Sequence, residues 1–83
     1  MKWKVQTNGE GYYWWEAAVP VGLLEVVYPS PEKFGCKWEA HWYANKDESV
    51  RMILGSAGTE DEAKAIAVWE LKKIVRRWSR ALR

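Results

Sequence analysis

The sequence is poor in cysteine and histidine, with one residue of each, Cys36 and His41. A single cysteine cannot form an intrachain disulfide, and a zinc site needs several cysteine or histidine ligands. On a strand, Cys36 and His41 point to opposite faces, which disfavours a cysteine–histidine nucleophile pair. His41 shares its face with Glu39, and we expect a solvated polar pair rather than an acid–base catalyst. These shortages predict a protein without catalysis, bound metal or cofactor.

Long apolar runs are also missing. No stretch approaches the roughly 18 apolar residues of a membrane span, and residues 1–5 do not contain the apolar segment of a signal peptide. The single cysteine fits a reducing compartment. We therefore expect a cytoplasmic protein that does not use a membrane as partner.

Tryptophan, in contrast, is abundant, with seven copies among 83 residues. This length supports one small domain, and each large aromatic side chain buries roughly 150–250 Å². A core of this size does not need seven indoles. We therefore expect some of the tryptophans to be exposed for contact with a partner.

Apolar and polar residues alternate in several short segments, as they do in half-buried strands. Asn8–Gly11 is a turn signal, and Pro29–Pro31 opens the longest loop. The alternating segments are residues 2–6, 12–19, 23–28, 36–43 and 50–55. The sequence therefore predicts an antiparallel meander of four or five strands over residues 2–56.

The last third of the chain has the pattern of an amphipathic helix. Thr59 is a favourable N-cap, and Glu62 completes a capping-box pattern three residues later. At about 100° per residue, apolar side chains share one face; they are Ala63, Ala67, Leu71, Ile74, Trp78 and Leu82. We predict one long C-terminal helix over residues 59–82, packed on one sheet face, in a single α+β domain spanning residues 1–83.

Charge is uneven along this helix. The chain has a formal net charge of +2, but residues 71–83 contain six bases and no acid. Trp69 lies within the basic sector, opposite the apolar stripe. This sector could follow a phosphate backbone with the indole stacked on a base, bind an acidic protein surface, or only solvate the helix and complement its dipole. The residues of this candidate site are Trp69, Lys72, Lys73, Arg76, Arg77, Arg80 and Arg83.

A second candidate surface is aromatic. Strand alternation puts Tyr12, Trp14, His41 and Tyr43 on the sheet face opposite the one expected to carry the helix. Tyrosine and tryptophan are frequent hot spots of protein interfaces, and aromatic sheet faces stack on bases in some RNA-binding proteins. Two alternatives remain: residues 21–35 fold over this face and bury it, or two such faces meet in a homodimer.

The junction between the last strand and the helix carries a further pattern. Residues 55–65 read Gly-Ser-Ala-Gly-Thr-Glu-Asp-Glu-Ala-Lys-Ala, or G-x-A-x-T-x-x-E-A-K. This junction resembles the arm-type DNA-binding modules at the N-termini of phage integrases, which are three-stranded sheets backed by a C-terminal helix. It is also similar to that of many short proteins of phages and mobile elements, some of which inhibit host defence systems such as CRISPR complexes.

The resemblance implies a phage or mobile-element protein that occludes a host protein or nucleoprotein, as anti-CRISPR-like inhibitors do. With the residues above, it predicts a non-catalytic binding module. We expect its partner-binding residues to be Tyr12, Trp14, Tyr43, Trp69, Arg76, Arg77 and Arg80. The alternative function is direct binding of DNA or RNA by the basic helix face.

Overall fold

A computed structural model describes residues 1–28, 37–44 and 51–81 of the protein, with Arg80 and Ala81 described as helical backbone only. Its elements follow one another as β1 (Lys4–Thr7), β2 (Tyr13–Val19), β3 (Gly22–Tyr28), β4 (Trp38–Tyr43), β5 (Arg51–Ala57) and α1 (Glu60–Ala81). The predicted succession of strands followed by one helix is confirmed.

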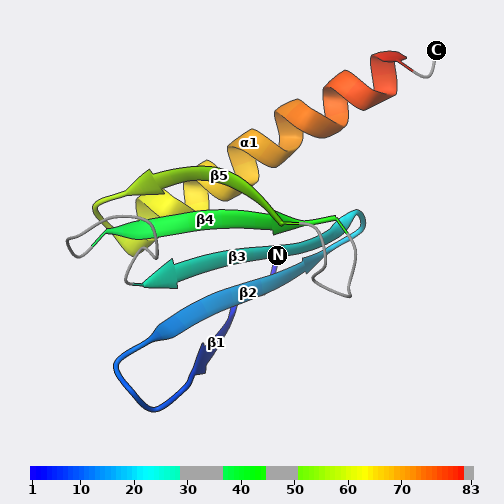
Figure 1. Ribbon diagram of the computed structural model, residues 1–83. Helices are drawn as coiled ribbons and strands as arrows, with labels where there is room; N and C mark the ends of the chain where they lie inside the picture. The colour runs from blue at the N-terminus through cyan, green and yellow to red at the C-terminus, as the bar shows by residue number, and fades with distance from the viewer. Residues whose placement is uncertain (29–36, 45–50, 82–83) are drawn as a thin grey trace.

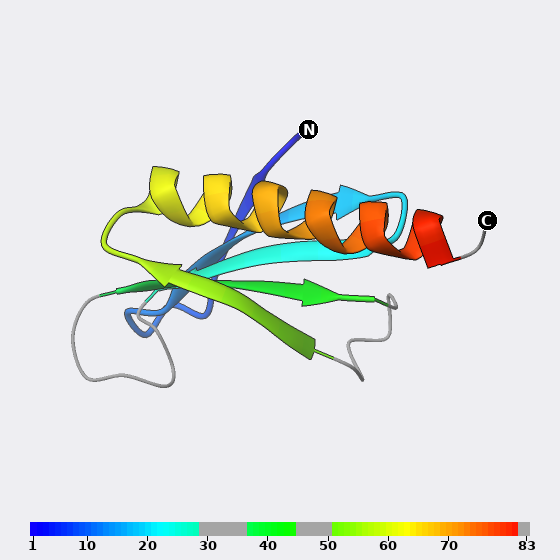
Figure 2. The ribbon, with the colours of Figure 1, turned by 90° about the horizontal axis from the view of Figure 1, so that it is seen from above.

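The five strands form one sheet in the order β1-β2-β3-β4-β5, and every neighbouring pair is antiparallel. The helix α1 runs across one face of this sheet and packs on β3, β4 and β5 (Figures 1 and 2). The fold is therefore a two-layer α+β meander, as the alternation and the helical periodicity predict.

Two connections explain why successive strands pair. Between β1 and β2, the Thr7 hydroxyl donates to the Tyr12 carbonyl over 3.0 Å, and the Glu10 N–H donates to Asn8 Oδ1 over 2.8 Å. Between β2 and β3, Gly22 has a φ of 132°. A Cβ at Gly22 would collide with the Tyr43 carbonyl oxygen, so this position requires glycine.

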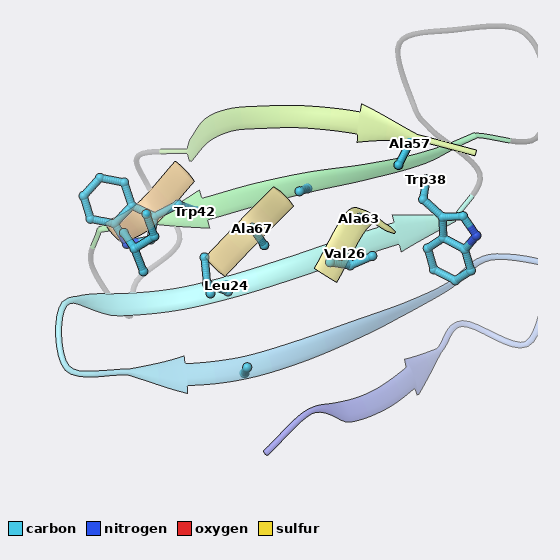
Figure 3. Packing of buried hydrophobic residues seen from close by; sticks show 10 residues of the cluster. Leu24, Val26, Trp38, Trp42, Ala57, Ala63 and Ala67 are labelled. Atoms are coloured by element: carbon cyan, nitrogen blue, oxygen red, sulfur yellow. The ribbon is translucent and has the colours of Figure 1, made fainter. Parts of the chain in front are cut away.

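The core lies between α1 and the middle of the sheet. Figure 3 shows the two indoles of Trp38 and Trp42 at its ends, with alanines between sheet and helix. Small side chains let the helix approach closely: a Cβ on Gly55 would lie 2.9 Å from Cγ2 of Ile66. The buried apolar residues are Ala17, Leu24, Val26, Trp38, Ala40, Trp42, Ala57, Ala63, Ala67 and Leu71.

The start of α1 follows the predicted capping. The Glu62 N–H donates to Thr59 Oγ1 over 3.2 Å, and the Ala63 N–H donates to the Thr59 carbonyl over 3.1 Å. Acidic side chains fill the first turn, where they complement the helix dipole.

The apolar stripe faces the sheet for most of its length. Ala63 and Ala67 are fully buried, and the Trp78 ring lies 5.3 Å from the Trp42 ring although its side chain is 48% exposed. Leu82, the predicted end of the stripe, lies outside the described residues. The stripe therefore places the helix correctly, but its C-terminal part is only half covered.

Candidate functional site

The outer side of α1 carries an exposed indole among bases. Trp69 is 65% exposed, and the lysines and arginines that follow it are exposed as well. Residues three, four and seven positions apart lie together on a helix surface, so these side chains form one patch on the side away from the sheet. We call it the basic helix face: Trp69, Lys72, Lys73, Arg76 and Arg77.

Most of these cations are not compensated. Lys73 Nζ lies 2.9 Å from Glu70 Oε1, an exposed pair of small energetic value. Within the part of the chain that the structure describes, Lys72, Arg76 and Arg77 make no ion pair. Three positive charges are therefore available to an anionic partner.

Two predicted members of the basic sector cannot be placed in this patch. Arg80 belongs to α1, but only its backbone is described, and Arg83 lies outside the described residues. The other five predicted residues lie together as the helical periodicity requires.

The outer side of α1 changes sign along its length. Asp61 and Glu62 are exposed in its first turn, whereas Lys72, Arg76 and Arg77 are exposed two or more turns later. A uniformly negative partner, such as a nucleic-acid backbone, that contacted the whole length of α1 would be repelled by Asp61 and Glu62. The patch therefore fits a partner that contacts the C-terminal half alone or one whose own charge alternates.

The second candidate surface lies on the other side of the sheet. Trp14 pairs with Val27, and Val27 pairs with Glu39. The neighbouring Val26 is buried in the core under α1, and successive strand residues point to opposite faces, so these three side chains lie on the face away from α1. Tyr43 shares this second sheet face, and Tyr12, which precedes β2, is exposed.

The polar side-chain atoms of Trp14 and Tyr43 form hydrogen bonds within the protein. The Trp14 indole donates to Glu16 Oε1 over 2.8 Å, and the Tyr43 hydroxyl donates to Glu25 Oε1 over 3.1 Å. Both side chains are partly buried rather than bare. The predicted contact residues thus divide between opposite faces of the sheet, so one flat partner surface cannot touch all of them at once.

His41 and Glu39 differ from their prediction. His41 is 1% exposed and Glu39 is also buried, so the expectation of a solvated pair is wrong. His41 Nδ1 lies 3.3 Å from Glu25 Oε1, and its Nε2 bonds to Glu39 Oε1. Strand alternation predicts the sheet face on which a residue lies but not whether another part of the protein covers that face. The hydrogen bonds to Glu25 and Glu39 offset the cost of burying the His41 ring.

The environment of His41 changes its protonation. Burial disfavours the imidazolium and by itself lowers the pKa of His41, but the hydrogen bonds to Glu25 and Glu39 and their negative charges outweigh this. The pKa of His41 therefore lies above its ordinary value of 6.5. The hydrogen bonds of His41 to Glu25 on β3 and Glu39 on β4 therefore link the two strands on this face of the sheet.

A groove of about 580 Å³ lies between the C-terminal half of α1 and the turn joining β2 to β3. Neither His41 nor its carboxylate partners line it. Sequence reasoning missed this groove, although Val68 and Val75 lie beside the apolar stripe and seven residues apart. The side chains that line it include those of Val19, Val21, Val68, Leu71, Val75, Lys72 and Arg76.

Among residues 1–28, 37–44 and 51–81, no cluster of three histidine, cysteine or acidic side chains could hold a metal ion. No helix in these ranges has the length and apolarity to cross a bilayer. Cys36 lies outside these ranges. Comparison with protein-family models, with curated proteins and with solved structures gave no match to the chain.

Proposed function

We propose that this protein is a non-catalytic binding module that docks on an acidic surface of a host protein or nucleoprotein through the basic helix face. The observation that carries this proposal is Trp69, which is 65% exposed beside three cations that form no ion pair with any other described residue. Exposed tryptophan and arginine are the residue types most enriched in interface hot spots.

The charge pattern of α1 supports a protein partner. Asp61 and Glu62 at one end of the outer side and Arg76 and Arg77 toward the other suit a surface with charges of both signs. Trp69 lies between the two ends and supplies the apolar anchor. In the proposed role, a cytoplasmic phage or mobile-element product covers a working surface of its target, as anti-CRISPR-like inhibitors do.

Photo-crosslinking tests this proposal. Benzoylphenylalanine in place of Trp69 is expected to crosslink to a discrete host protein in lysate, whereas the same residue in place of Ile53, which is exposed on β5, is not. A variant that also carries Lys72→Glu, Arg76→Glu and Arg77→Glu is expected to lose the crosslink. Equal crosslinking from both positions would contradict docking by the helix.

Binding of DNA or RNA is the second candidate function, and the same indole favours it because every base offers a face for stacking. Fluorescence anisotropy with labelled single- and double-stranded oligonucleotides, at about 50 and 200 mM salt, separates the two functions. Phosphate contacts predict binding that weakens with a log–log slope of about −0.7 to −0.9 per neutralised phosphate. Absence of binding at the lower salt concentration leaves the protein partner.

A further inference from the structure

We propose that the groove between α1 and the β2–β3 turn binds an anionic acyl compound, an aliphatic chain that ends in one carboxylate or phosphate head. The groove occupies about 580 Å³, within the roughly 300–1,000 Å³ typical of small-molecule sites. Residues of the β2–β3 hairpin and of the C-terminal half of α1 line it together.

The walls of the groove suit a flexible hydrocarbon chain. Val19 and Val21 line it from the hairpin, and Val68, Leu71 and Val75 line it from the helix. None of the described residues that line it is aromatic, so they offer no ring on which a base or another planar ligand could stack. From Val68 to Ser79 the helical wall rises by about 16 Å, which is long enough for an extended chain.

The charged side chains of the groove select an anionic head. Lys72 and Arg76 line it one helical turn apart, a rise of about 6 Å, so both cations can reach the oxygens of a single head group. Neither makes an ion pair with another described residue. Among the described residues that line the groove none is acidic, so Lys72 and Arg76 would repel a cationic head.

This site shares Lys72 and Arg76 with the basic helix face but does not include Trp69, Lys73 or Arg77. Leu71 and Val75 line the groove, whereas Trp69, Lys73 and Arg77 are exposed and do not line it. Loss of Trp69 is therefore expected to leave acyl binding unchanged. Failure of either proposal leaves the other standing.

The test is a titration with decanoate, below its micelle concentration, followed by methyl NMR spectra of the full chain. Saturating shifts are expected for Val19, Val21, Val68 and Val75, with none for Ile53 on β5. Decyltrimethylammonium, which has the same chain with the opposite charge, is expected to bind at least about tenfold more weakly. Decyl phosphate distinguishes a phosphate head from a carboxylate head.

Two double variants isolate the head-group contact. Lys72→Gln with Arg76→Gln is expected to weaken decanoate binding by about tenfold or more. Lys73→Gln with Arg77→Gln removes the same charge from α1 outside the groove, and its affinity is expected to stay within about twofold of the wild type. All four side chains are exposed, so folding is expected to persist and can be checked by circular dichroism.

A third variant tests the chain contact. Val75 is 36% exposed, so Val75→Trp can fill the groove without disturbing the buried core and is expected to abolish the methyl shifts. Equal binding of the cationic chain, equal losses in the two double variants, or shifts that centre on Ile53 would each overturn the proposal.

Discussion

The ammonium group of Lys64 on α1 lies 3.7 Å from the centroid of the Trp15 ring on β2. Lys64 Nζ also forms an ion pair with Glu60 Oε2 over 3.1 Å. The other oxygen of this carboxylate, Oε1, accepts a hydrogen bond from the Trp15 indole N–H over 2.7 Å. The helix body packs on β3, β4 and β5. This small network is therefore what ties β2 to the first turns of the helix.

Removal of the Lys64 charge is expected to weaken this tie. Lys64→Met keeps the aliphatic stem but loses the cation–π contact and the ion pair, so the free energy of unfolding should fall by about 1 kcal/mol. Urea denaturation followed by circular dichroism measures the change. Lys73→Met is the matched control, because its exposed pair with Glu70 should contribute no more than about 0.5 kcal/mol. Equal effects of the two substitutions would contradict a special role for Lys64.

Trp42 and Trp69 are expected to separate stability from binding. Trp42 is buried, donates its indole N–H to the Val21 carbonyl over 3.1 Å and packs on Trp78, so Trp42→Ala should cost about 3–5 kcal/mol. Trp69→Ala removes an exposed side chain and should change stability by less than about 0.5 kcal/mol. Thermal melts of both variants provide the comparison. A large loss for Trp69→Ala would assign that indole to the fold instead of to a partner.

Stability is expected to fall as pH rises through the raised pKa of His41. The unfolded chain titrates near the ordinary value of 6.5, so the contribution of the charged histidine is fully present below that pH and is lost at higher pH. Among the described residues, the ionisable groups bonded to its ring are Glu25 and Glu39. Denaturation at a series of pH values should show this loss in the wild type and not in His41→Gln, and parallel profiles would contradict it.

An NMR titration of the His41 ring measures its pKa directly. Its midpoint is expected above 6.5, because the partner carboxylates outweigh burial. A midpoint at or below 6.5 would contradict the raised pKa of His41.

The sequence predicted the fold better than it predicted the surfaces. Alternation and capping depend on neighbours within a few residues, so the strand order and the N-cap of α1 at Thr59 could be predicted directly. The burial of His41 and the groove beside Val75 depend on contacts between elements that are distant in the sequence. Local sequence patterns do not predict such tertiary contacts. The exposure of Trp69 could be predicted because it lies opposite the apolar stripe of its own helix.

The contact between helix and sheet is expected to depend on small side chains. Ala67 is fully buried in the middle of this interface, so Ala67→Leu should overpack it and lower the free energy of unfolding by about 1–3 kcal/mol. Ala65 is exposed on the same helix, and Ala65→Leu makes the same change in helix composition without entering the core. That control should stay within about 0.5 kcal/mol of the wild type. If Ala67→Leu were equally harmless in urea denaturation, the helix would not approach the sheet as closely as Ala63, Ala67 and Gly55 allow.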